Sequence, residues 1–153
     1  MSSYRVLVTG SRSWARPTVV YEALDEVLAE HEPLIVVHGA NARGADNMAQ
    51  GWALDRRHTG RFVAYEPHPA DWKKHGRRAA GFIRNQEMVD AGADECVAFL
   101  MPCMLPSCAA KPPHASHGAS DCAGRARKAG IPVTEFRPLT RKEPDGQRAP
   151  VAH

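Results

Sequence analysis

The sequence predicts an α/β fold in which a mostly parallel sheet is flanked by helices on both faces. Segments with the apolar, β-branched character of strands alternate along the chain with segments of helical periodicity. The strand segments are continuous apolar runs rather than alternations of apolar and polar residues, which indicates burial on both faces of the sheet. These two observations are typical of a Rossmann-like three-layer sandwich.

The first half of the chain contains three of the expected strands and two helices. The strands are the apolar runs at residues 4–9, 34–37 and 62–65. The first helix is expected to begin at Pro17, because proline suits the first turn of a helix, and to end near residues 31–33. A second helix is expected from Ala45, with Trp52 on its apolar face and therefore in the core.

The second half continues the alternation but is interrupted once. Its expected elements are a helix around residues 83–91 that ends at Gly92, a strand at 95–100, a helix at about 119–129 and a last strand that begins at 131–133. A proline-rich loop insertion around residues 101–117 contains two cysteines and two histidines and does not fit the pattern. We expect one domain over residues 1–137, followed by a polar, flexible tail over residues 138–153.

Composition and charge restrict the class of protein. The 153 residues are 43% hydrophobic and 24% charged, as in ordinary globular domains. The net charge of +3 suits an anionic ligand but is too small to indicate a nucleic-acid partner, so none is expected. No apolar stretch has the length of a membrane span or of a signal peptide, and we expect a cytoplasmic protein whose four cysteines are reduced.

Glycines follow the first two expected strands. Gly10 is followed by Arg12, and Gly39 is followed by Arg43. The carboxyl ends of parallel strands meet at one edge of the sheet, where ligands bind and where helix N-termini favour anions. The pattern therefore favours a phosphate-bearing small molecule. An alternative is that the glycines only form tight turns and the arginines are solvated.

Four segments occur in a recognisable order along the chain. They are Val8-Thr9-Gly10-Ser11-Arg12; His38-Gly39 with Arg43-Gly44-Ala45-Asp46; Pro69-Ala70-Asp71-Trp72 with Gly76, Gly81, Arg84-Asn85 and Met88; and Ser116-His117-Gly118-Ala119-Ser120-Asp121 before Ala129-Gly130-Ile131-Pro132-Val133. Together they resemble the YspA/cpYpsA-related branch of the SLOG superfamily, over about residues 4–136. That superfamily also includes the LOG-type nucleoside-monophosphate phosphoribohydrolases and the DNA-processing protein DprA.

The resemblance implies a Rossmann-like fold that holds a nucleotide or nucleotide-derived ligand, such as an ADP-ribose-type compound, and a homo-oligomer. The ligand-binding residues that it implies are Gly10, Ser11, Arg12, Gly39, Arg43, Gly44, Asp46, Arg84, Asn85, Ser116, Gly118, Ala119 and Asp121. Arg43 and Arg84 are the candidates for direct phosphate contacts, because a guanidinium can hold a phosphate through two hydrogen bonds. Ala119 stands where the family's S-x-G-T-x-D loop usually has threonine, so one hydroxyl donor is missing.

Three functions follow from this resemblance. The first is a nucleotide binder that acts as a sensor, a sequestering protein or a nucleotide-processing protein. The second is a phosphoribohydrolase that cleaves an N-glycosidic bond, with Asp121 or Asp46 as the working carboxylate. The glutamate of the LOG-type enzymes aligns with Cys122, however, and their twin-glycine loop is missing. The third is a DNA-associated protein related to DprA. No catalytic residue is assigned, and no cofactor is expected.

Several side chains have two interpretations. Asp46 is either a helix cap or an acceptor for a ribose hydroxyl. Trp72 is interpreted as a core residue under a loop, with stacking on a base as the alternative. Cys122 is expected in the core.

The insertion raises the question of a metal site. The residues concerned are Cys103, Cys108, His114, His117 and Cys122. Their spacing matches neither C-x-x-C nor H-x-x-x-H, so we expect no metal, and incidental cysteines in a proline-rich loop. The basic cluster Lys73-Lys74-His75 with Arg77-Arg78 is interpreted as a solvated loop, with contact to a polyanion as the alternative.

Overall fold

The computed structural model describes residues 2–138, and of these the side chains of residues 77 and 78 are left out. The predicted tail over residues 138–153 thus lies, except for residue 138, outside the described residues. The described elements are β1 (Tyr4–Gly10), α1 (Pro17–Glu30), β2 (Leu34–His38), α2 (Ala45–His58), β3 (Val63–Pro67), α3 (Trp72–His75), α4 (Arg77–Ala91), β4 (Glu95–Phe99), the 3₁₀ turn η1 (Pro106–Cys108), α5 (His117–Lys128) and β5 (Val133–Phe136).

The strands form one parallel sheet in the order β3-β2-β1-β4-β5. β1 is the central strand, and its Val6 pairs with Val36 of β2 on one side and Glu95 of β4 on the other. The chain builds the sheet outward from β1 in one direction through β2 and β3, and then in the other through β4 and β5. The strand order therefore reverses between β1 and β4. Such a switch point is where open parallel sheets bind ligands.

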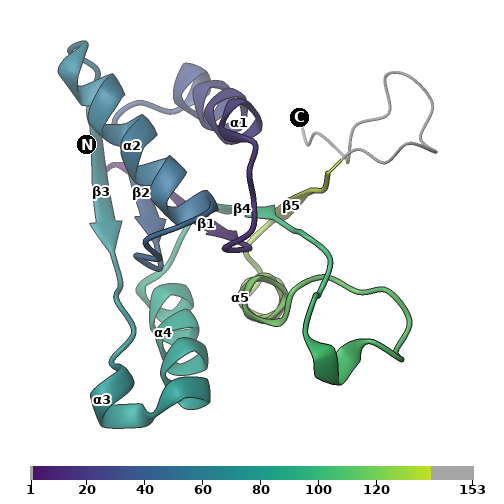
Figure 1. Ribbon diagram of the computed structural model, residues 1–153. Coiled ribbons are helices and arrows are strands. Elements are labelled where there is room, and N and C mark those ends of the chain that lie inside the picture. The colour runs from purple at the N-terminus through teal and green to yellow at the C-terminus, as the bar shows by residue number, and fades with distance from the viewer. Residues whose placement is uncertain (1, 139–153) are drawn as a thin grey trace.

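Helices cover both faces of this sheet, as Figure 1 shows. α1 and α2 lie on one face, and Val6 and Val8 of β1 pack in the core beneath them with Leu24 and Trp52. α4 and α5 lie on the other face, where Leu7 packs in a second cluster with residues of both helices. Successive side chains of a strand point to opposite faces, so a strand covered on both sides must be apolar at every position. The predicted three-layer Rossmann-like α/β fold is confirmed.

The segment between β3 and β4 differs from the prediction. α3 was not predicted, and α4 begins at Arg77 rather than near residue 83. The Asp71 carboxylate caps α3 by accepting a hydrogen bond from the backbone N–H of Lys74 at 3.0 Å. Gly76, with a φ of +79°, separates the two helices. A single-turn helix is too short to show an apolar periodicity, so a pattern search misses it.

None of the helices within residues 2–138 combines the length and the apolar character needed to cross a bilayer. Even α4, with 15 residues, is shorter than the roughly 20 residues that a membrane span requires.

The core beneath α1 should tolerate truncation poorly. Leu24 is fully buried between α1 and the sheet, so Leu24→Ala should lower the free energy of unfolding by about 2–5 kcal/mol. The matched control Leu54→Ala lies on the exposed side of α2 and should change it by no more than about 0.5 kcal/mol. Urea denaturation monitored by circular dichroism measures both. Equal losses for the two variants would contradict this assignment of the core.

Candidate functional site

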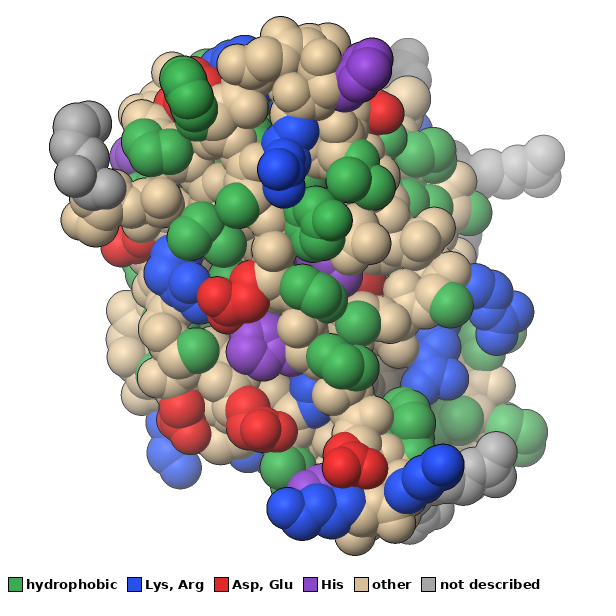
Figure 2. Space-filling view, turned by 90° about the vertical axis from the view of Figure 1, so that its left-hand side faces the viewer, with side chains coloured by type: hydrophobic (Ala, Val, Ile, Leu, Met, Phe, Trp, Pro, Cys, Tyr) green, Lys and Arg blue, Asp and Glu red, His purple; other side chains and the backbone are tan. Residues whose placement is uncertain are grey.

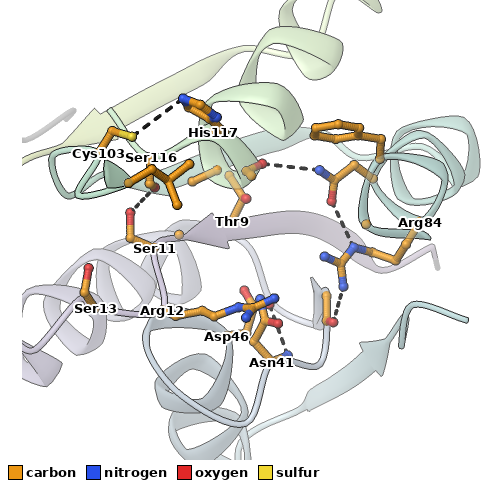
Figure 3. A pocket seen from close by; sticks show the side chains of 18 of the residues that line it. Thr9, Ser11, Arg12, Ser13, Asn41, Asp46, Arg84, Cys103, Ser116 and His117 are labelled. Carbon is orange, nitrogen blue, oxygen red and sulfur yellow. Dashed lines mark hydrogen bonds between the residues drawn. The ribbon is translucent and has the colours of Figure 1, made fainter. Parts of the chain in front are cut away.

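A cavity of about 790 Å³ lies at the carboxyl end of β1, beside the switch point. Its walls come from residues 8–13, from the loop after β2, from α3 and α4, from residues 102–105 of the insertion and from residues 116–119 at the start of α5. Figure 3 shows labelled side chains from all of these segments except α3 converging on one space. The volume is within the range of about 300–1,000 Å³ that is usual for small-molecule sites.

Two glycines allow α2 to begin directly against the end of β1. A Cβ on Gly10 would overlap the Cβ of Ala45, the first residue of α2. Gly44 has a φ of +80°, and a Cβ there would lie 2.8 Å from the Cα of Arg12. The close approach therefore needs glycine at both positions, and Gly44 also needs glycine for its backbone conformation. It places Asp46, in the first turn of α2, on the wall of the cavity.

Asp46 is a buried carboxylate, with 3% of its surface exposed. Its Oδ2 accepts hydrogen bonds from Asn41, at 3.3 Å from the backbone nitrogen and 3.1 Å from Nδ2 (Figure 3). Burial raises the pKa of Asp46 to about 6, while the hydrogen bonds from Asn41 and the charge of Arg84 act in the opposite direction. The carboxyl group can therefore exchange a proton near neutral pH. A perturbed carboxyl group in a cleft is a common feature of functional sites.

Arg84 extends from α4 over the loop that follows β2. Its side chain is buried, and its Nη1 donates hydrogen bonds to the carbonyl oxygen of Gly39 and, at 3.3 Å, to that of His68. Its Nε donates to Oδ1 of the neighbouring Asn85 at 2.9 Å. A Cβ on Gly39 would lie 2.6 Å from Nη1, so only glycine leaves room for the guanidinium. The positive charge is thus held in the cavity wall by carbonyl groups.

His38 supports the turn that carries Gly39. The backbone N–H of Ala40 donates to Nδ1 of His38 at 3.0 Å, so Nε2 carries the proton and donates to Oε1 of Gln50 at 2.8 Å. Burial lowers the pKa of His38, which favours the neutral form of the ring. This histidine therefore has a structural role.

Asn85 and Asp121 connect α4 to the start of α5. Nδ2 of Asn85 donates to Oδ2 of Asp121 at 3.0 Å and to the carbonyl oxygen of Gly118 at 3.2 Å. The same Asp121 oxygen accepts from Nε of Arg125 at 2.7 Å, in an ion pair within α5. Asp121 does not line the cavity. Of the two carboxylates considered for hydrolysis, only Asp46 faces the cavity.

Ser11 connects the loop after β1 to the insertion and to the start of α5 through hydrogen bonds. Its Oγ accepts a hydrogen bond from the backbone N–H of Met101 at 2.9 Å and shares a second hydrogen bond with Oγ of Ser116 (Figure 3). Ala119 is almost fully buried and packs with Ala98 and Leu100 of the core. A methyl group therefore fits the position where the family usually has threonine.

Most of the predicted ligand-binding residues line this one cavity. They are Gly10, Ser11, Arg12, Gly39, Asp46, Arg84, Asn85, Ser116, Gly118 and Ala119. Arg43, Gly44 and Asp121 do not line it. Arg43 is exposed on the loop before α2, whereas Gly44 is buried where α2 meets the first loop. Of the two predicted arginines that follow the glycine turns, only Arg12 therefore lines the cavity.

The cavity also contains aromatic residues that the sequence interpretation missed or misplaced. Trp72 lines it and has 44% of its surface exposed, so the expectation of a core residue was wrong. Phe82 of α4, 39% exposed, lines it as well. Trp72 directly follows Pro69-Ala70-Asp71, one of the segments that carry the family resemblance. This position was the signal in the sequence that could have placed Trp72 in the site. Trp52 and Cys122 are fully buried, as predicted.

Four potential metal ligands meet beside the cavity. Cys103, Cys108, His114 and His117 present ligand atoms that all lie within 4.8 Å of one another. Cys103 and His117 also line the cavity (Figure 3). The spacing of these residues did not predict that they would converge.

The fold defines the class of this protein, a Rossmann-like α/β domain with a cavity at the switch point of its sheet. Residues 4–75 match the family described as "YspA, cpYpsA-related SLOG family". The chain is 47% identical over 133 residues to the "Gene 61 protein" of Mycobacterium phage D29, across 86% of this chain and 95% of that protein. No solved structure gives a significant match. The chain belongs to the YspA, cpYpsA-related SLOG family, as the sequence motifs predicted.

The raised pKa of Asp46 predicts a pH-dependent gain in stability for Asp46→Asn. The ordinary pKa of an aspartate is 3.8, and in the folded protein it is about 6. Between these two pH values the folded state therefore binds more protons than the unfolded state. The ionised carboxylate therefore destabilises the fold above about pH 6, and the neutral amide removes this cost. A change of one pKa unit corresponds to about 1.4 kcal/mol. The gain in the free energy of unfolding should therefore reach at most about 3 kcal/mol at pH 7.5 and nearly disappear at about pH 4.

Urea denaturation at pH 4 and pH 7.5 measures this difference. Asp90→Asn is the matched control, because Asp90 is exposed on α4 and its contact with Gln86 can be kept by an amide. The control should change the free energy of unfolding by no more than about 0.5 kcal/mol. A destabilised Asp46→Asn variant at pH 7.5, or a gain equal at both pH values, would contradict the buried-carboxylate assignment.

Proposed function

We propose that the protein binds a nucleotide or nucleotide-derived ligand in the cavity at the carboxyl end of β1. The observation that carries this proposal is that one cavity at the switch point combines arginine side chains with exposed aromatic rings. Arginine suits phosphate, and aromatic rings suit a base. Membership in the SLOG family supports a nucleotide-related function.

Arg12 and Arg84 supply the positive charge for the phosphate groups. In the described part of the chain, Arg12 forms no ion pair, and Nη2 of Arg84 has no protein acceptor. Their remaining N–H groups are available to an anion. The N-terminal turn of α5, with Gly118 and Ala119 on the cavity wall, adds backbone N–H groups and the positive end of a helix dipole.

The other groups on the cavity wall suit a nucleoside. Trp72 and Phe82 offer exposed ring surface on which a base can stack. Asp46 and Asn41 are acceptor and donor groups of the kind that bind ribose hydroxyls. Phosphate, ribose and base would each then have a chemically matched part of one cavity.

A second candidate, N-glycosidic hydrolysis, is favoured by Asp46 alone. General acid–base catalysis works best when the pKa of the catalytic group is close to the working pH, and the pKa of Asp46 is about 6. In this role the ionised Asp46 would take a proton from the water that attacks the ribose carbon, while the bond to the base breaks and the base leaves with a proton from solvent. Release of a free base, lost in Asp46→Asn, is the result that distinguishes this candidate from binding without turnover.

A DNA-associated function has no comparable support. Lys73 and Lys74 are exposed on the short helix α3. On the face that Figure 2 shows, acidic and basic side chains are interspersed, without a continuous basic surface. Binding to single-stranded DNA is therefore included in the ligand screen as an alternative outcome.

A thermal-shift screen tests the proposed function. AMP, ADP-ribose, NAD, cyclic nucleotides and short single-stranded DNA are added to the protein, and each nucleotide is then analysed by chromatography. A ligand that binds the folded state should raise Tm with concentration. Recovery of intact ligand supports binding, and a free base supports hydrolysis. The absence of any shift with nucleotides, together with a salt-sensitive shift with DNA, would contradict the proposal.

Arg12→Ala should weaken the binding of a nucleotide found in this screen by about tenfold or more, since hydrogen bonds to charged groups contribute about 1.5–3 kcal/mol. The Tm of the free protein should stay nearly unchanged, because Arg12 is exposed. Isothermal titration calorimetry measures the affinity. Arg16→Ala, an exposed residue outside the cavity wall, is the matched control. A large loss in Arg43→Ala combined with none in Arg12→Ala would place the ligand outside this cavity.

A further inference from the structure

The insertion between β4 and α5 is closed on itself by backbone pairing. Pro102 and Ala115 form an antiparallel bridge, and the N–H of Cys103 donates to the carbonyl oxygen of His114 at 2.7 Å. Cys103 and His114 are therefore neighbours, although ten residues separate them in the sequence. Cys108 ends the 3₁₀ turn η1, and His117 is the first residue of α5.

These four side chains direct their donor atoms at one point. Nε2 of His117 lies 3.6 Å from Sγ of Cys103, 3.5 Å from Sγ of Cys108 and 3.1 Å from Nε2 of His114. A tetrahedral zinc ion has Zn–S bonds of about 2.3 Å and Zn–N bonds of about 2.0–2.1 Å. Tetrahedral angles then separate sulfur from nitrogen by about 3.5 Å, and the two nitrogens by about 3.3 Å. The observed separations are close to those values.

Hydrogen bonding within the cluster does not account for this arrangement. His117 has one Nε2 atom, which carries at most one proton, yet three potential partners surround it. Nδ1 of His114 lies 2.8 Å from the carbonyl oxygen of Pro112, which can only accept, so Nδ1 carries the proton and Nε2 presents its lone pair to the cluster. Zinc-bound histidines usually make this kind of outer hydrogen bond to a backbone carbonyl.

We propose that Cys103, Cys108, His114 and His117 bind one Zn²⁺ ion. A set of two thiolates and two imidazoles in tetrahedral arrangement suits zinc, whereas Mg²⁺ and Ca²⁺ prefer oxygen ligands. The two thiols lose their protons to solvent when the ion binds. Four protein ligands leave no open coordination position, so the site is structural rather than catalytic.

The ion would join the insertion to the first turn of α5. Because Cys103 and His117 also line the cavity, the metal holds one of its walls in place (Figure 3). The four residues between Cys103 and Cys108 are within the usual range of two to four for zinc sites, whereas the two residues between His114 and His117 are one fewer than usual. The metal site does not depend on the proposed nucleotide function.

Metal analysis of the untagged protein, purified under reducing conditions from zinc-supplemented medium, tests the site. Elemental analysis should find one zinc ion per chain. After removal of zinc by a chelator, titration with Co²⁺ should give the visible bands of a tetrahedral ion and a thiolate-to-metal charge-transfer band. Both should saturate at one equivalent and disappear when Zn²⁺ is added. Substoichiometric zinc together with no thiolate charge transfer would overturn the proposal.

Variants identify the ligands. Cys108→Ser and His114→Ala should each remove or strongly shift the cobalt bands, whereas Cys96→Ala and His58→Ala should retain them, because Cys96 lies in the core and His58 is exposed on α2. Unchanged cobalt spectra in both ligand variants would overturn the assignment. If those variants do not fold, X-ray absorption of the zinc-loaded natural protein decides. Two sulfur and two nitrogen neighbours support the site, and oxygen and nitrogen neighbours alone contradict it.

Discussion

The N-terminus of α2 lies against the carboxyl end of β1, and the geometry of the site depends on this contact. Gly10 and Gly44 make it possible, because a Cβ at either position would overlap atoms of the opposing segment. The contact fixes where α2 begins and thereby buries Asp46 at the sheet edge. A side chain at either glycine would push α2 away from β1, and the carboxylate of Asp46 would move with it.

The electrostatic character of the cavity follows from that burial. Asp46 loses contact with water, its pKa rises to about 6, and the charge of Arg84 compensates only in part. Arg84 is itself anchored by carbonyl groups of Gly39 and His68, which leaves its positive charge uncompensated by an ion pair among the described residues. In the proposed function, a phosphate of the ligand would supply the opposite negative charge. The zinc ion proposed in the insertion would stabilise the part of the cavity wall that contains Cys103 and His117. The order of the insertion would then affect the shape of the ligand cavity.

The sequence was sufficient to predict the fold, because strands buried on both faces must be continuously apolar, and it also predicted which loops meet at the sheet edge. It could not predict the direction of individual side chains. Arg12 and Arg43 both follow glycine turns, yet only Arg12 lines the cavity. Trp72 was misplaced because an aromatic residue near a loop suits a core as well as a ligand site. The Cys/His cluster depends on the bridge between Pro102 and Ala115. This contact cannot be predicted from the spacing of the cysteines and histidines in the sequence.

We propose that the cavity at the end of β1 binds the phosphate groups of a nucleotide. An NMR titration of ¹⁵N-labelled protein with ADP-ribose, or with the best ligand from the screen, tests it most directly. Phosphate binding in this cavity predicts saturable shifts concentrated at the backbone amides of Ser11, Arg12, Gly118 and Ala119, with the exposed C-terminal end of α2 unaffected. Shifts centred on Arg43 and the outer surface, with these amides unchanged, would contradict it.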